Sequence, residues 1–140
     1  MSAIPLRQEA PKMCILKLYN ADYTLDPYAD RLMSQGYEVV NVRNYDEAVF
    51  TAHRCHPALI VVYDDPATEV DAVHWLEMQH MDREAWMAMT PLLILADASR
   101  VPVLRIEELP DRVVVLQRRA DTLNQLTRAV KRLLRIWQLE

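Results

Sequence analysis

The chain has 140 residues, a length typical of one domain, and its 51% apolar and 26% charged residues exclude wholesale disorder. No apolar run approaches the roughly 18 residues that a membrane span needs, and residues 1–10 lack the hydrophobic block of a signal peptide. We therefore expect a cytoplasmic protein with no membrane contact. Residues 1–11 are predicted to form a flexible leader and residues 12–140 a single domain.

Charge distribution and glycine content exclude further classes of protein. Residues 1–110 carry 9 lysines and arginines against 17 aspartates and glutamates, whereas residues 111–140 carry 7 against 3. A weakly acidic body with a basic end is not typical of a general nucleic-acid binder. The single glycine, Gly36, excludes the glycine-rich phosphate loops of P-loop and Rossmann proteins. Two cysteines are too few to predict a disulfide framework.

Short apolar runs alternate with helical patterns along the chain. Runs such as 59–62 and 113–116 are apolar at every position, which is typical of parallel strands covered by helices on both faces. Lys17 interrupts the first run, so we expect either that it reaches an acid such as Asp64 or that the strand is shifted by one residue. The predicted strands are Met13–Tyr19, Tyr37–Arg43, Ala58–Tyr63, Leu92–Ala96 and Arg112–Gln117.

Capping residues mark the helices. Asp26 and Pro27 open the first helix and Gly36 closes it, while Asn44 and Glu47 form a capping pair for the second. The last helix is predicted to be capped by Asp121 and to carry apolar residues at three-to-four spacing. The predicted helices span residues 27–35, 45–55, 69–80, 83–89, 103–109 (between two prolines) and 122–137.

Strands that alternate with helices in this way predict an α/β fold. We expect a flavodoxin-like, doubly wound parallel sheet of five strands in the order 2-1-3-4-5, with helices on both faces. In such sheets ligands bind beyond the carboxyl ends of the strands, at the switch point between strands one and three. Residues 19–22 and 63–65 follow those two strands, and the functional site is expected there.

Four stretches in order along the chain resemble the response-regulator receiver domain, over roughly residues 12–137. They are Gly36–Val39, Pro57–Val62, Thr90–Leu95 and Asp121–Leu123. The resemblance implies an aspartate at the end of strand three that accepts a phosphoryl group. It also implies Mg²⁺ on an acidic pair after strand one, a hydroxyl on strand four, and a lysine and an aromatic residue on strand five.

Counting along these stretches places a different residue at each position of that machinery. The acidic pair is replaced by Tyr19 and Asn20, the phosphoacceptor by Tyr63, the hydroxyl by Ala96 and the lysine by Arg118. Tyrosine cannot form an acyl phosphate, and alanine donates no hydrogen bond. The resemblance therefore implies a pseudo-receiver, a signalling module that is not an enzyme, needs no cofactor and acts through protein contacts.

A shift of the third strand by one residue leaves an alternative open. Asp64 would then be the phosphoacceptor of a genuine two-component receiver, with Asp22, Asp64 and Asp65 as carboxylates around Mg²⁺. The simpler interpretation is a polar turn after a buried strand. Ala96 would still lack the hydroxyl under this alternative.

Other clusters have simpler interpretations. His53, Cys55 and His56 lie close in sequence, but a zinc site needs three or four converging ligands, so we expect ordinary helix residues. Cys14 is interpreted as a small core residue of the first strand. The stretch 75–89, rich in methionine and tryptophan, predicts core packing, with an adaptable partner surface as the alternative.

A basic face on the last helix is the predicted interaction surface. Arg128, Arg132 and Arg135 lie opposite the apolar stripe, and Ile106 lies on the short helix before strand five. We expect a protein partner with an acidic surface, including a second copy of this chain that offers the acids of residues 107–111. We do not expect nucleic acid as a partner, because only one helix is basic.

Overall fold

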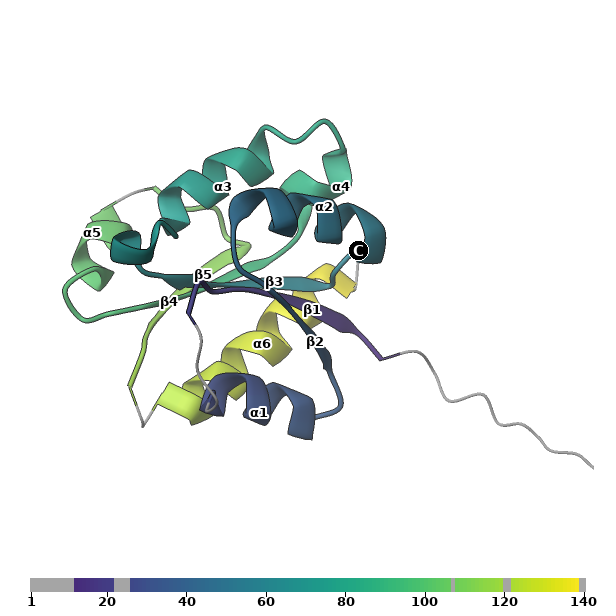
Figure 1. Cartoon of the computed structure of the whole chain (residues 1–140). Coiled ribbons are helices and arrows are strands. Elements are labelled where there is room, and N and C mark those ends of the chain that lie inside the picture. Colours follow the sequence, from purple (N-terminus) through teal and green to yellow (C-terminus); the bar gives the residue numbers. More distant parts are fainter. Residues whose placement is uncertain (1–11, 22–25, 107, 120–121, 139–140) are drawn as a thin grey trace, which may run out of the picture.

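Five parallel strands form one sheet in the order β2-β1-β3-β4-β5, which confirms the predicted fold (Figure 1). The computed structural model describes residues 12–21, 26–106, 108–119 and 122–138, so the predicted leader lies outside the described residues. Each predicted strand agrees with the structure to within one residue at both ends. The strands are β1 (Cys14–Leu18), β2 (Glu38–Val42), β3 (Leu59–Asp64), β4 (Leu92–Ala96) and β5 (Val113–Gln117).

Helices cover both faces of the sheet. On one face lie α1 (Pro27–Ser34) and α6 (Leu123–Gln138); on the other lie α2 (Tyr45–Cys55), α3 (Ala72–His80), α4 (Ala85–Met89) and α5 (Val101–Ile106). All six residues of β3 are buried, which explains why this central strand is apolar along nearly its whole length. Within the described part of the chain, no helix is both long and apolar enough to span a membrane.

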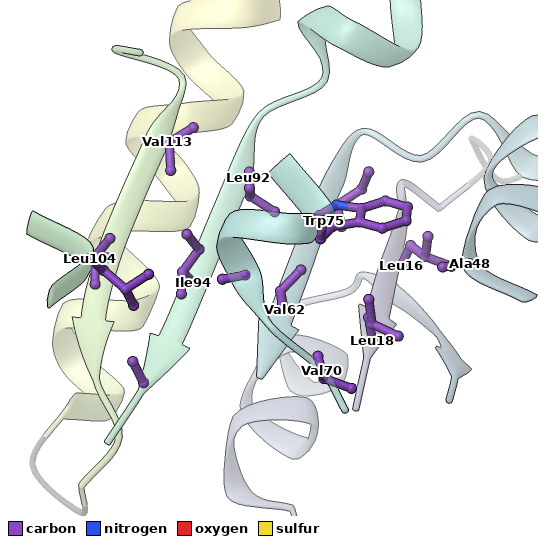
Figure 2. Packing of buried hydrophobic residues seen from close by; sticks show 14 of the residues in the cluster. Leu16, Leu18, Ala48, Val62, Val70, Trp75, Leu92, Ile94, Leu104 and Val113 are labelled. Carbon is purple, nitrogen blue, oxygen red and sulfur yellow. The ribbon is translucent and has the colours of Figure 1, made fainter. Parts of the chain in front are cut away.

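Successive strand residues point to opposite faces and build two apolar clusters. Leu16, Val62 and Leu92 point toward the fully buried Trp75 of α3, as Figure 2 shows. Ile15 and Val61 point the other way, against α1 and α6. Two-sided burial is the main stabilising contribution of such a sheet.

The predicted caps of the first two helices are present. The Asp26 carboxylate accepts hydrogen bonds from the backbone N–H groups of Tyr28 and Ala29 at 3.1 and 3.2 Å. Asn44 accepts from the Glu47 N–H at 2.8 Å, and the Glu47 side chain accepts from the Arg43 N–H at 3.0 Å. Gly36 has φ +93°, the conformation that a glycine after a helix end provides. The predicted Asp121 cap lies outside the described residues.

Two predicted helices have wrong bounds, and a third, predicted over 83–89, begins two residues later, at Ala85. The third helix begins at Ala72 rather than at residue 69, because Glu69 adopts a left-handed φ of 68° and Asp71 is the N-cap. The short helix spans Val101–Ile106 rather than 103–109. Its second residue is Pro102, where the missing N–H has no partner within the helix in any case.

Candidate functional site

The residues predicted for the site gather at the carboxyl edge of the sheet. Tyr19 and Asn20 follow β1, Tyr63 and Asp64 end β3, and Ala96 ends β4; Arg118 follows β5. Because Tyr63 and Asp64 are adjacent on a strand, their side chains point to opposite faces. The edge therefore carries two separate clusters, one on each side of the sheet.

Aromatic rings fill the side that faces α1. The rings of Tyr19 and Tyr63 stack with their centroids 4.4 Å apart, and Tyr28 meets Tyr63 edge-on at 6.1 Å. Tyr63 is 2% exposed, and its hydroxyl donates to the Asp26 carboxylate at 2.8 Å. Tyr63, which the count along the chain places at the phosphoacceptor position, is thus buried and hydrogen-bonded.

Asp26 also binds the lysine that interrupts the first strand. The Lys17 ammonium forms an ion pair with the Asp26 carboxylate, and both side chains are about nine-tenths buried. The ammonium also lies 5.1 Å from the centroid of the Tyr63 ring, a cation–π distance. Lys17 thus reaches an acid, as one of the two alternatives predicted, and the strand is not shifted. The acid is Asp26 and not the suggested Asp64, because Asp64 lies on the other face of the sheet.

Asp64 lies on the other face and is completely buried. Arg100 binds it through two hydrogen bonds, from Nε to Oδ2 at 2.7 Å and from Nη2 to Oδ1 at 3.2 Å. The Ala72 N–H donates to the same carboxylate at 2.8 Å. The hydrogen bond to Asp64 raises the pKa of Arg100, against the opposing effect of burial. Both Asp64 oxygens are therefore engaged by the protein itself.

The strand register relates these residues to the fourth strand. Asp64 is paired with Ala96, whereas Tyr63 is paired with Leu95. Ala96 is buried in the apolar cluster with Ile94, and its methyl side chain offers no hydrogen bond. Of the two alternative phosphoacceptor positions on the third strand, Asp64 is thus the residue paired in register with Ala96.

Arg118 extends over the aromatic side of the edge. Its Nη2 donates to Asp97 at 3.0 Å and its Nη1 to the Tyr19 hydroxyl at 3.4 Å. Burial alone would lower the pKa of Arg118, but the hydrogen bond to Tyr19 and the charges of Asp97 and Asp65 outweigh it and raise the pKa. Asn20 donates to the Thr68 carbonyl at 2.9 Å, so its side chain is also engaged.

The described residues do not fit a Mg²⁺ ion at Asp64. A magnesium site needs carboxylate oxygens that are free to coordinate, and the Arg100 guanidinium already holds both oxygens of Asp64. Asp65 is half-buried in a backbone bridge with Val70, and Asp22 lies outside the described residues. Among the described side chains, no three His, Cys, Asp or Glu residues gather closely enough to hold a metal ion.

Sequence reasoning missed several residues that organise this edge. Arg100, Tyr28 and Asp97 were not singled out, and Asp26 was assigned only its capping role. Arg100 gave one weak signal, since it is a long cation four residues after the end of a buried strand. Its partner lies 36 residues away in the sequence, which no local pattern reveals.

The residues of the other clusters lie away from this edge. His53 contacts Asp82 at 2.9 Å, and the ring of His56 stacks on Trp86 at 4.1 Å. Cys14 is half-buried, and its Sγ lies 3.2 Å from that of Cys55, a contact between free thiols that the sequence did not predict.

The methionine- and tryptophan-rich stretch divides between core and surface. Trp75 and Met87 are completely buried, as core packing requires, whereas Met81 is 78% exposed and Met89 51%. On the predicted interaction face, Ile106 is 83% exposed. Arg128, Arg132 and Arg135 are exposed on α6.

The strand order and the helices on both faces define a flavodoxin-like, doubly wound α/β protein. No family model and no curated protein matches the chain. Among solved structures, the fold is similar to that of response-regulator receiver domains. A chemotaxis response regulator of Vibrio cholerae aligns with a TM-score of 0.69 and 15% identity, covering 88% of this chain and 99% of the other.

Two further receivers show the same similarity. A response regulator receiver protein from Sinorhizobium medicae aligns with a TM-score of 0.71 and 17% identity, covering 89% of this chain and 95% of the other. A response regulator from Desulfuromonas acetoxidans aligns with a TM-score of 0.64 and 17% identity, covering 89% and 98%. At these identities the comparison establishes the fold, and function is argued from the residues.

Proposed function

We propose that this chain is a pseudo-receiver, a cytoplasmic signalling module that acts through protein contacts without aspartyl phosphorylation and without enzymatic activity. The observation that carries the proposal is the buried ion pair between Asp64 and Arg100. Similarity to receiver structures supports the signalling role, and the residues at the carboxyl edge support the loss of phosphotransfer.

Phosphorylation requires a carboxylate oxygen that can attack phosphorus. Both oxygens of Asp64 accept hydrogen bonds, from Arg100 and from the Ala72 N–H, and the side chain is completely buried. Breaking this pair would leave a buried charge without its counter-ion, which is strongly destabilising. Tyr63 offers no carboxylate, and its hydroxyl is bound to Asp26. Neither third-strand residue is therefore prepared as a phosphoacceptor.

The residues that transmit a phosphorylation signal in receivers are also replaced. In the receiver family a hydroxyl on strand four and an aromatic on strand five move together. Counting along the stretches that resemble this family puts Ala96 and Val115 at those positions, and both are buried. Without residues that switch between two conformations, binding or modification at the carboxyl edge cannot change the conformation of the β5 face. We therefore expect Mg²⁺ with a phosphate mimic to leave the backbone NMR shifts of residues 113–119 unchanged.

Intact mass after incubation with Mg²⁺ and acetyl phosphate tests the proposal. We expect no phosphate adduct on the natural chain. An adduct that disappears in Asp64→Asn would overturn the pseudo-receiver and establish a genuine two-component receiver. Arg100→Ala is the informative second variant, because it frees Asp64 while leaving Ala96 and Arg118 in place. An adduct on Arg100→Ala alone would identify Arg100 as the residue that blocks phosphorylation.

We propose a second copy of the chain as one protein partner of this module. β5 is an edge strand, with α5 packed on one face of the sheet and α6 on the other. Ile106 provides an exposed apolar centre, and Arg132 of α6 can face the exposed acids Glu108 and Asp111 of the other copy. Exposed ion pairs contribute only about 0–1 kcal/mol each, so the apolar contact should carry most of the affinity.

Light scattering over a concentration series tests this pairing. We expect a dimer that Ile106→Glu disrupts strongly and Arg132→Glu weakens. The matched control is Arg54→Glu, an exposed arginine at the end of α2, far along the sheet from β5. A monomer at every concentration, or a dimer that neither substitution affects, would contradict the pairing.

A further inference from the structure

A pocket at the amino edge of the sheet is separate from the candidate site. It lies between the second half of α3 and the segment that enters β5, has a volume of about 510 Å³ and is lined by Leu76, Glu77, His80, Met81, Pro110 and Arg112. Because parallel strands all begin at one edge and end at the other, the start of β5 lies opposite the edge that carries Tyr63 and Asp64. This volume is within the range of small-molecule sites.

Arg112 gives the pocket its chemical character. The residue is 6% exposed, and its Nη1 donates one hydrogen bond, to the Thr90 carbonyl at 3.1 Å. Among the residues that the structure describes, no carboxylate is ion-paired with it, and Nε and Nη2 make no hydrogen bond. Burial accordingly lowers the pKa of Arg112, and no charged partner among the described residues offsets the effect. A buried cation without a counter-ion is costly, and an anion that enters the pocket would remove that cost.

The guanidinium is held in a fixed position before any ligand arrives. The Thr90 carbonyl that it binds also accepts a hydrogen bond from Gln79 Nε2 at 2.7 Å. Gln79 is completely buried and donates in addition to the Met87 carbonyl at 3.0 Å, which ties α3 to α4. Such preorganisation reduces the entropy that binding costs, because the cation need not be ordered by the ligand.

We propose that this pocket binds a small apolar monocarboxylate. The carboxylate would pair with the free side of the Arg112 guanidinium, whose planar fork matches two carboxylate oxygens. The hydrocarbon part would pack on Leu76, Pro110 and the exposed, adaptable Met81. A phosphate dianion fits less well, because one buried cation faces it and Glu77 in the lining repels the second charge.

Titration of the whole chain with octanoate, followed by amide NMR shifts, tests the proposal. We expect saturable binding at about millimolar concentration or tighter, with shifts confined to residues 76–81 and 110–113. Acetate carries the charge without the apolar part, and 1-octanol the apolar part without the charge, so both should bind more weakly. N-acetylleucine in a parallel titration distinguishes a peptide carboxyl end from a fatty-acid-like ligand as the source of this chemistry.

Two substitutions separate the charge from the apolar contact. Arg112→Met should reduce octanoate affinity by about tenfold or more and leave 1-octanol affinity unchanged or higher. Glu77→Gln removes the repelling charge from an exposed position and should strengthen octanoate binding about twofold. Glu84→Gln, an exposed acid outside the pocket, is the matched control and should change nothing.

The proposal is overturned if octanoate and 1-octanol bind equally, or if octanoate shifts no residue in the two named segments. It is also overturned if Glu77→Gln and Glu84→Gln behave alike. That comparison does not depend on Arg112→Met folding, because both glutamates are exposed and neither replacement disturbs the core.

Discussion

Removal of the Arg100 side chain measures what the ion pair with Asp64 contributes. In Arg100→Ala the Asp64 carboxylate, which is completely buried in the natural chain, loses both hydrogen bonds from Arg100 and keeps only the one from the Ala72 N–H. Loss of one partner of a buried pair costs about 3–5 kcal/mol. The Arg100 side chain is 24% exposed, so water can reach the space that it leaves, and we expect a cost of about 2–3 kcal/mol. In urea this corresponds to a midpoint lower by about 1–2 M.

Two further variants serve as controls for the stability of Arg100→Ala. Arg105→Ala removes an exposed arginine from α5 and should change the free energy of unfolding by less than about 0.5 kcal/mol. The double variant Asp64→Leu with Arg100→Met replaces the pair by apolar residues and should recover most of the lost stability. If Arg100→Ala is no less stable than Arg105→Ala, the ion pair with Arg100 is not what holds Asp64, and Asp64 is not blocked as a phosphoacceptor by this pair.

Three other changes have expected outcomes. Diamide should oxidise Cys14 and Cys55 to a disulfide, taking up the two electrons and two protons, because their Sγ atoms lie 3.2 Å apart. The two cysteines are 41 residues apart in the sequence, so the disulfide should stabilise the fold by about 3–4 kcal/mol in urea unfolding. The oxidation should be slow at neutral pH, because burial and the neighbouring Cys55 raise the pKa of Cys14 to about 12. Burial raises the pKa of Asp82, but the hydrogen bonds from His53 and from the Glu84 N–H, together with the charges of His53 and Arg83, outweigh it and hold that pKa below its ordinary value. The ionised Asp82 therefore stabilises the fold fully above pH 3.8, and this contribution is lost as the pH falls through the lower pKa of the folded protein. Asp82→Asn should be less stable than the natural chain at pH 7 and should lose less of its stability below about pH 4. Gly36→Ala should cost about 1–2 kcal/mol in the same urea assay through its positive φ alone, since a Cβ there would meet no atom within 4 Å.

Each of these outcomes has a result that contradicts it. For the thiols, Cys55→Ser treated with diamide is the control, and equal stabilisation in that variant would exclude a disulfide as the cause. For the carboxylate, Asp82→Asn and the natural chain losing stability in parallel below pH 4 would show that the depressed pKa has no energetic effect. For the turn, a Gly36→Ala protein as stable as a Gln35→Ala control would mean that the backbone relaxes to a negative φ.

Much of the fold could be predicted because it depends on local spacing. A strand buried on both faces must be apolar at nearly every position, so runs such as 59–62 identify strands without knowledge of their neighbours. Caps are equally local, since Asp26 and Asn44 act on N–H groups two or three residues away. Among the helix bounds that were wrong, residue 69 depended on a left-handed Glu69 and residue 103 on Pro102 inside the first turn of α5. Helix propensity does not distinguish either residue from a loop.

The residues at the carboxyl edge could be named from the sequence alone, because the order of strands in a doubly wound sheet brings the ends of β1, β3, β4 and β5 together. The contacts of those residues depend on how each face of the sheet packs. Lys17 pairs with Asp26 and Asp64 with Arg100 because adjacent strand positions face opposite sides of the sheet, and each side meets a different loop. Such partners lie far apart in the chain, and close packing of the two faces, not any local pattern, selects them.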